Sequence, residues 1–168
     1  LITNYNKSKF LRKSLASVIS QNYKNYEIII FDDCSTDRSI KIIKKYKKVK
    51  LKVNKVKNKK KSGPLNQING IIECFKRSRG NIICLLDADD YFKKDKLLKI
   101  DQFFRKNKEL NCVYDFPLNN TSQFIFKKRN NEKSIWPTIF PTSCISLRKK
   151  FLKIFLNNVN KNQFPNLE

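Results

Sequence analysis

Apolar and polar residues alternate along this chain with two different periods, one typical of strands and one of helices. The segments 27–31 and 81–86 are dominated by isoleucine and other apolar residues, the pattern of strands that are buried on both faces of a sheet. Before the first of them, a helix is predicted to begin at Ser8, a suitable N-cap. Its apolar positions recur at helical spacing: Leu11, Leu15, Val18 and Ile19.

The rest of the chain continues this alternation and then loses it. Further helices are predicted over 37–46, 63–77, 94–107 and 149–156, and further strands over 1–3, 49–56, 112–114, 124–126 and 144–147. Strands that alternate with helices indicate an α/β fold, a Rossmann-like, mainly parallel sheet with helices on both faces. In such folds ligands bind beyond the carboxyl ends of the strands.

Acidic residues follow both buried strands. One cluster lies within residues 32–37, and the other is Asp87-Ala88-Asp89-Asp90. Parallel strands place their carboxyl ends along one edge of a sheet, so these carboxylates should gather in one crevice. Their mutual repulsion needs compensation, and a divalent cation with oxygen ligands would supply it.

The spacing inside each cluster predicts different roles for its acidic residues. Asp87 and Asp89 are separated by one small residue, so one could coordinate a metal while the other accepts hydrogen bonds from a sugar. Asp32 and Asp33 are adjacent and should point to opposite sides of an extended chain. Only one of that pair is expected to face a ligand, while the other holds the loop.

Two acidic residues have simpler alternative readings. Asp37 is equally well explained as a residue that stabilises the start of the next helix, and Ser35 or Thr36 could do the same. Asp90 is equally well explained as a turn or cap residue before the following helix.

The amino-acid composition limits the classes of partner that the protein is expected to bind. The 168 residues carry a net charge of +23, which raises the alternative of a basic nucleic-acid-binding protein. Lysine greatly outnumbers arginine, however, and arginine is the usual reader of base edges. We therefore expect no nucleic-acid partner. Peripheral contact with an anionic membrane surface stays open.

Cysteine and histidine usage excludes some chemistry. The sequence contains no His, which excludes catalysis or metal binding by His within it, and its five cysteines show no metal-ligand spacing. Cys84 and Cys112 lie in apolar strand-like segments and are expected to be buried thiols. A reducing compartment suits this usage, so we expect a cytoplasmic protein, either free or peripheral at the inner face of the membrane.

Four motifs in order resemble family-2, inverting glycosyltransferases of the GT-A fold. Thr3-Asn4-Tyr5-Asn6 resembles the end of that family's first strand, and Gln21-Asn22-Tyr23 resembles the end of its first helix. Residues 27–37 are similar to the family's Glu-Ile-Ile-Val-Val-Asp-Asp-Gly-Ser-Thr-Asp signature. Residues 80–90 match the strand that ends in its Asp-x-Asp motif. The resemblance covers residues 1–110.

The resemblance implies a role for each matching residue. Thr3 and Tyr5 would line the pocket for the nucleotide base, and Asp33 would accept a hydrogen bond from N3–H of uracil or thymine, which favours a UDP- or dTDP-linked donor. Asp87 would contact the ribose and the donor. Asp89 would bind Mg²⁺ or Mn²⁺ across the diphosphate. The expected acceptor is a glycan or a lipid-linked hydroxyl in the synthesis of cell-surface polysaccharide.

The chain departs from the family pattern at three places. Cys34 stands where glycine is usual, and Gln67-Ile68 replaces Ala-Arg in the segment 62–70. The carboxylate base that activates the acceptor should come from the later part of the domain, where Glu168 is the last residue. The base is expected to be Glu168 or to lie beyond it.

Residues 1–168 are thus expected to form a single GT-A domain, truncated in its first strand and in its acceptor and base region. Such a segment would bind donor and metal and be slow or inactive alone. A phospho-acceptor receiver domain is the other α/β alternative. It needs an acidic pair after the first strand and a lysine after the fifth, where this chain has Asp115.

Overall fold

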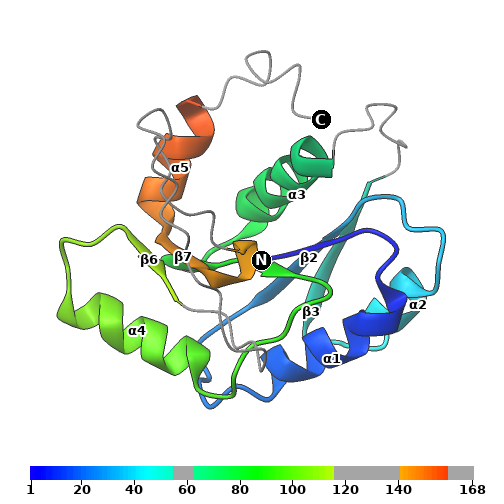
Figure 1. Ribbon diagram of the computed structural model, residues 1–168, viewed down its shortest axis with the longest axis horizontal. Helices are drawn as coiled ribbons and strands as arrows, with labels where there is room; N and C mark the ends of the chain where they lie inside the picture. Colours follow the sequence, from blue (N-terminus) through cyan, green and yellow to red (C-terminus); the bar gives the residue numbers. More distant parts are fainter. Residues whose placement is uncertain (55–62, 116–140, 159–168) are drawn as a thin grey trace, which may run out of the picture.

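The computed structural model describes residues 1–54, 63–115 and 141–158 (Figure 1). The described elements follow one another in this order: β1 (Ile2–Asn4), α1 (Ser8–Ile19), β2 (Ile28–Asp32), α2 (Ser39–Ile43), β3 (Val49–Val53), α3 (Gly63–Arg77), β4 (Ile82–Cys84), β5 (Leu86–Asp87), α4 (Lys96–Lys106), β6 (Cys112–Tyr114), the 3₁₀ turn η1 (Thr142–Cys144), β7 (Ile145–Arg148) and α5 (Lys149–Asn158). The predicted strand 124–126 lies outside the described residues.

The main sheet is parallel and has the strand order β3-β2-β1-β5. All of β2 is buried, as expected for a strand with helices on both faces. In the centre of the sheet Thr3 of β1 lies opposite Phe31 of β2 and opposite Asp87 of β5. The carboxyl ends of these strands therefore lie side by side.

The predicted strand 81–86 is two strands in two different sheets. Strand β4 joins an antiparallel sheet of order β4-β7-β6, whereas β5 joins the parallel sheet. The chain passes from one sheet to the other between Leu85 and Leu86. The Leu85 N–H donates to the Ile145 carbonyl of the antiparallel sheet at 3.1 Å, whereas the Leu86 N–H donates to the carbonyl of Leu1, next to β1, at 2.9 Å. The prediction of a fifth strand at 112–114 is confirmed, but this strand belongs to the antiparallel sheet.

Helices cover both faces of the parallel sheet, as predicted. On one face α1 and α2 bury their apolar residues against Ile28 and Ile30 of β2. On the other face α3 packs against β1 and β2, with Cys74 against Ile29 and Phe31. Figure 1 shows α3 on the opposite side of the strands from α1 and α2.

Helix α3 approaches the sheet closely because it carries a glycine at the crossing point. A Cβ atom on Gly70 would lie 2.9 Å from side-chain atoms of both Phe31 and Thr3. Any larger residue would therefore push α3 away from β1 and β2. This close approach also fixes the side chain of Thr3, which lies at the carboxyl end of β1.

The starts of the first two helices share one carboxylate. Ser8 is not the N-cap of α1, as the sequence predicted, but its first helical residue, and Lys7 precedes it without a side-chain cap. Asp37 accepts the Ser8 N–H at 2.9 Å and the Ser39 N–H at 2.8 Å. The prediction that Asp37 stabilises the next helix is confirmed, and it stabilises α1 as well.

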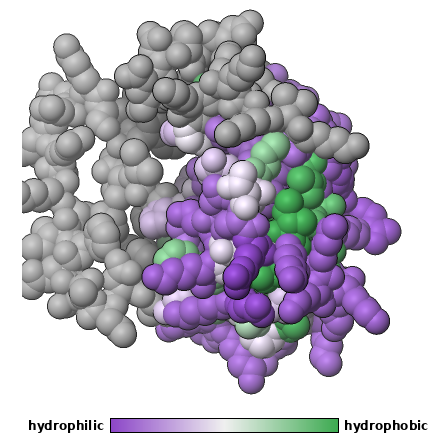
Figure 2. Space-filling model, turned by 90° about the vertical axis from the view of Figure 1, so that its right-hand side faces the viewer, coloured by the Kyte–Doolittle hydropathy of each residue, from purple (hydrophilic) through white to green (hydrophobic). Residues whose placement is uncertain are grey.

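The coloured surface in Figure 2 is mostly hydrophilic, with one larger hydrophobic patch and a few smaller ones. The prediction that Cys84 and Cys112 are buried was wrong, because both are only partly buried, whereas Cys74 and Cys144 are buried. None of the five cysteines forms a disulfide. In the described part of the chain, no helix is both long and apolar enough to cross a membrane.

Candidate functional site

Side chains that the sequence singled out meet at the carboxyl edge of the parallel sheet. Asp33 follows β2, Thr3 and Tyr5 lie at the end of β1, and Asp87 ends β5. Because β2, β1 and β5 are consecutive neighbours in the sheet, these residues come from one continuous edge. This is the place where α/β sheets bind ligands.

The adjacent residues Asp32 and Asp33 have different environments, and one of them, Asp32, holds the loop as predicted. Asp32 is fully buried and holds the loop, because its carboxylate accepts the Asn4 side-chain amide at 2.6 Å and the Ser35 N–H at 2.9 Å. Asp33 is only partly buried and accepts the Asn54 side-chain amide at 2.9 Å. Asp33 is therefore the member of the pair that a ligand can reach.

The loop after β2 turns through Cys34, which has a φ of 58°. This left-handed conformation is the reason glycine is favoured at such a position. The Cys34 thiol donates to the Asn54 carbonyl at 2.8 Å, so the same residue Asn54 contacts both Cys34 and Asp33. The departure from glycine keeps the turn and adds a contact to it.

Asp87 is the most enclosed member of the second acidic cluster. Its carboxylate oxygen Oδ1 accepts the Gln67 side-chain amide at 2.7 Å and the Thr3 hydroxyl at 3.4 Å. Burial raises the pKa of Asp87, and the neighbouring charges of Asp90 and Asp89 raise it further, while the hydrogen bond from Gln67 opposes them. The cluster thus carries the repulsion that a cation would relieve.

Asp89 points to the outside of this turn. Its Oδ2 forms an ion pair at 2.6 Å with Lys7, and both side chains are substantially exposed, 39% for Asp89 and 44% for Lys7. An exposed pair of this kind contributes little to stability. Lys7 can therefore leave Asp89 at small cost when a cation or an anionic ligand arrives.

Asp90 is a turn residue, as one alternative held, but it is no helix cap. Its N–H donates to the Asp87 carbonyl at 3.0 Å, and α4 begins only at Lys96. The Ser143 hydroxyl donates to Asp90 Oδ2 at 2.5 Å and accepts the Asp87 N–H at 3.0 Å. Ser143 therefore ties the two ends of the acidic turn together.

The remaining predicted residues differ in how the structure places them. Tyr5 is 51% exposed, beyond the end of β1, so it is available to stack on a ligand. Thr3 lies next to Asp87, one strand away from Asp33. Glu168 lies outside the described residues.

The acidic edge suits a metal that shares its ligands with a substrate. Among residues 1–54, 63–115 and 141–158, no three His, Cys, Asp or Glu side chains converge so that they could hold a metal ion. Mg²⁺ commonly takes only one or two carboxylates and completes its shell with water and substrate phosphates. Asp89, exposed beside the crowded pair Asp87 and Asp90, fits that arrangement.

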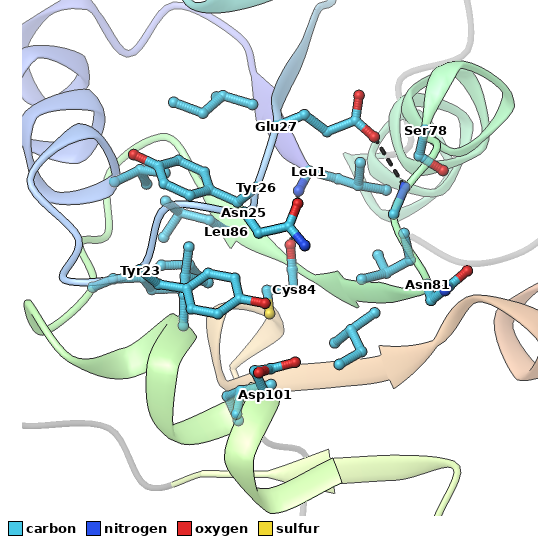
Figure 3. Close-up of a pocket in the computed structure, with 18 of the residues that line it drawn as sticks. Leu1, Tyr23, Asn25, Tyr26, Glu27, Ser78, Asn81, Cys84, Leu86 and Asp101 are labelled. Atoms are coloured by element: carbon cyan, nitrogen blue, oxygen red, sulfur yellow. Dashed lines mark hydrogen bonds between the residues drawn. The ribbon is translucent and has the colours of Figure 1, made fainter. Parts of the chain in front are cut away.

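A separate cavity lies at the opposite edge of the sheet. Its volume is about 550 Å³, and its lining includes Leu1, Glu27, Asn81 and Asp101 (Figure 3). Glu27 accepts the Gly80 N–H at 3.0 Å there. Because this cavity surrounds the amino ends of β1, β2 and β4, it contains none of the acidic residues of the carboxyl edge, and we do not place the donor in it.

Two residues of the candidate site were not predicted from the sequence. Gln67 belongs to the segment that departs from the family pattern, and it donates to Asp87 and, at 3.3 Å, to the Thr142 hydroxyl. Ser143 lies 53 positions from Asp90. The departure itself was a usable signal for Gln67, whereas nothing local marks Ser143.

Comparisons with known proteins identify the family of this chain. Residues 1–161 match the model of the family described as Glycosyl transferase family 2. TuaG of Bacillus subtilis, a glycosyltransferase assigned to teichuronic acid biosynthesis, is 34% identical over 113 residues, which cover 67% of this chain and 42% of TuaG.

Two solved structures share the fold. The crystal structure of Staphylococcus aureus TarS 1–349 in complex with UDP superposes with a TM-score of 0.67 at 21% identity, covering 92% of this chain and 47% of that one. The mannosyltransferase PcManGT of Pyrobaculum calidifontis, in complex with GDP-Man and Mn²⁺, gives 0.71 at 17% identity, covering 92% and 45%.

This chain spans less than half the length of these three proteins. Their fold confirms the expected GT-A architecture, with its parallel sheet and flanking helices. The match to the family model covers nearly all of the chain. The chain therefore belongs to glycosyltransferase family 2.

Proposed function

We propose that this chain forms the donor- and metal-binding part of an inverting glycosyltransferase. It would take a sugar from a UDP- or dTDP-linked donor and transfer it to an acceptor hydroxyl in cell-surface polysaccharide synthesis. The observation that carries the proposal is the common edge of Thr3, Asp33, Asp87 and Asp89 on one parallel sheet. Family membership supports the class of reaction.

The nucleotide is proposed to lie across the ends of β1 and β2. Asp33, held by Asn54 at 2.9 Å, would accept N3–H of uracil or thymine, and Thr3 and Tyr5 would line the base pocket. Guanine presents a different edge, so a GDP-linked donor should bind more weakly. Asp87, fixed by Gln67, would accept hydrogen bonds from the ribose and the sugar.

Asp89 is proposed to hold Mg²⁺ or Mn²⁺ against the donor diphosphate. When bound, such an ion acts as a Lewis acid that offsets the charge building on the departing nucleoside diphosphate. Lys7, at 2.6 Å from Asp89, would move toward the phosphates and add a second positive charge. Asp87 stays in place, because its partners belong to β1 and α3.

The acceptor hydroxyl is proposed to attack the anomeric carbon opposite the leaving diphosphate. Its proton goes to a carboxylate base, which would be Glu168 or a residue beyond it. A general base typically contributes about 10²- to 10⁴-fold to the rate of such a step. The acceptor is proposed to be a glycan or a lipid-linked hydroxyl, and the relative TuaG, assigned to teichuronic acid biosynthesis, supports a role in polysaccharide synthesis.

Calorimetric titration with UDP, dTDP and GDP, each with and without Mn²⁺, tests the donor proposal. UDP and dTDP should bind with Mn²⁺, and GDP should bind at least about tenfold more weakly, the size of one lost hydrogen bond in a polar site. Asp33→Ala should abolish the preference for UDP over GDP. Absence of binding by all three nucleotides would refute the donor site. Tight binding of DNA or RNA instead would favour the nucleic-acid alternative.

A further inference from the structure

Ser143 lies between the backbone of Asp87 and the carboxylate of Asp90 in the acidic turn. Its hydroxyl accepts the Asp87 N–H at 3.0 Å and donates to Asp90 Oδ2 at 2.5 Å. A hydroxyl has a single proton to donate, and here that proton is directed at Asp90. Ser143 is also buried, and its short bond to Asp90 is partly buried.

The turn that carries Ser143 is itself firmly anchored. The Lys96 ammonium donates to the Ser143 carbonyl at 2.7 Å and pairs with Asp115 at 2.7 Å, and only 10% of the Lys96 side chain is exposed. On the other side Thr142 accepts the Gln67 amide. Figure 1 shows η1 in orange beside β5 at the centre of the molecule. Ser143 therefore cannot shift without breaking contacts on two sides.

The hydrogen bond from Ser143 makes the three carboxylates of the turn unequal. Asp87 Oδ1 is taken by Gln67, and Asp90 Oδ2 is taken by Ser143. Among the described residues, Asp89 is held only by the exposed ion pair with Lys7, which is weak and easily replaced. Three carboxylates within four residues would otherwise compete for the same cation.

We propose that Ser143 is a positioning residue that withholds Asp90 from the metal and so leaves Asp89 as its protein ligand. This inference rests on the proposed function, since it concerns the metal site of that function. It assigns a role to a residue that lies far from both acidic motifs in the sequence.

Binding of Mn²⁺ without nucleotide, measured by the electron paramagnetic resonance signal of free Mn²⁺, tests the inference. Ser143→Ala should free Asp90 and strengthen Mn²⁺ binding by roughly threefold or more, because ligand charge sets affinity at such sites. The double variant Ser143→Ala/Asp90→Asn should lose that gain. Ser143→Thr, which keeps the hydroxyl, should behave like the wild-type protein.

A second measurement separates positioning from general loss of structure. Asp90→Asn alone keeps an acceptor for Ser143 and should change Mn²⁺ binding by less than about threefold, whereas Asp89→Asn should abolish it. A large loss in Asp90→Asn would overturn the inference, as would unchanged Mn²⁺ binding in a folded Ser143→Ala. If Ser143→Ala does not fold, Mn²⁺ binding by Asp90→Asn and Asp89→Asn still tests the inference.

Nucleotide binding is then added to the same variants. Ser143→Ala should bind UDP with Mn²⁺ about 10-fold more weakly than the wild-type protein does, because Asp87 loses the anchor for its N–H. If the wild-type protein fails to bind UDP at all, the proposed donor site is refuted, while the Mn²⁺ titrations still test Ser143.

Discussion

Cys34 shows how one residue can keep a turn that favours glycine. With a φ of 58° its side chain is crowded against the backbone, and a β-branched residue would be crowded more. Cys34→Gly should leave the free energy of unfolding within about 0.5 kcal/mol of the wild-type value, and Cys34→Val should lower it by about 1–2 kcal/mol. Urea denaturation of both variants measures this.

The two variants form a matched pair, because each loses the hydrogen bond from the thiol to Asn54. Any difference between them therefore reports the backbone conformation. Equal stabilities of Cys34→Gly and Cys34→Val would mean that residue 34 does not adopt the left-handed conformation.

At the scale of residues, the sequence predicted the acidic positions better than their partners. Asp87 and Asp33 were found because they follow apolar strands, and the rule for parallel sheets places such residues at one edge. Gln67 and Ser143 were not found, because their contacts to Asp87 join segments 20 and 56 positions apart. No local pattern encodes a hydrogen bond across that distance.

At the scale of elements, Asp37 links the starts of α1 and α2. Asp37→Ala should lower the free energy of unfolding by about 1–2 kcal/mol at pH 7, since it leaves two helical N–H groups without their acceptor. Asp95→Ala is the control. Asp95 precedes α4 but forms no side-chain cap, so its removal should cost less than about 0.5 kcal/mol.

The effect of Asp37 should depend on pH. Burial raises the pKa of Asp37, but hydrogen bonds from Ser39 and Ser8 lower it to about 2. Because this folded-state pKa lies below the unfolded value of about 3.9, the stabilisation is complete above that value and is lost as pH falls toward 2. Wild-type and Asp37→Ala stabilities should therefore converge in acid. A constant difference between pH 7 and pH 2.5 would contradict this role.

Helix α3 should be sensitive to volume at its crossing with the sheet. Gly70→Ala places a methyl group 2.9 Å from Phe31 and Thr3, and overpacking of this kind costs about 1–3 kcal/mol. Gly80→Ala is the control, since its nearest neighbour would be 3.6 Å away. Thermal unfolding compares the two. Equal melting temperatures would show that α3 can move away from β1 at no cost.

The division of residues 81–86 between β4 and β5 illustrates the limit of hydrophobic patterns. A continuous apolar segment predicts burial on both faces but does not say which strand lies alongside. The partner of β4 is β7. The residues of β7 lie more than 60 positions after those of β4 in the chain. The antiparallel sheet could therefore not be predicted from local sequence.

At the scale of the whole molecule, the net charge of +23 predicts attraction to anionic membranes. Co-sedimentation should retain the protein on phosphatidylserine-containing vesicles at low salt and release it at about 0.5 M salt, where the Debye length is only a few ångströms. Neutral phosphatidylcholine vesicles are the control. Equal binding to both kinds of vesicle would contradict an electrostatic contact.

The overall architecture was predictable because it depends on alternation of strands and helices, which the first 110 residues repeat clearly. The family signatures lie in the same region, at the carboxyl ends of β1, β2 and β5. The region after residue 110 was predicted less well, because its elements lack such signatures. Ser143, in the turn η1 that leads into β7, nevertheless reaches the carboxyl edge of the parallel sheet.

The central claim is that Asp89 couples a metal ion to nucleotide binding, and one calorimetric comparison tests it. UDP is titrated with and without Mn²⁺ into the wild-type protein, Asp89→Ala and the control Asp101→Ala, whose carboxylate pairs with Arg105 on α4. Mn²⁺ should strengthen UDP binding to the wild-type protein and to Asp101→Ala but not to Asp89→Ala. Full strengthening by Mn²⁺ in Asp89→Ala would contradict the account.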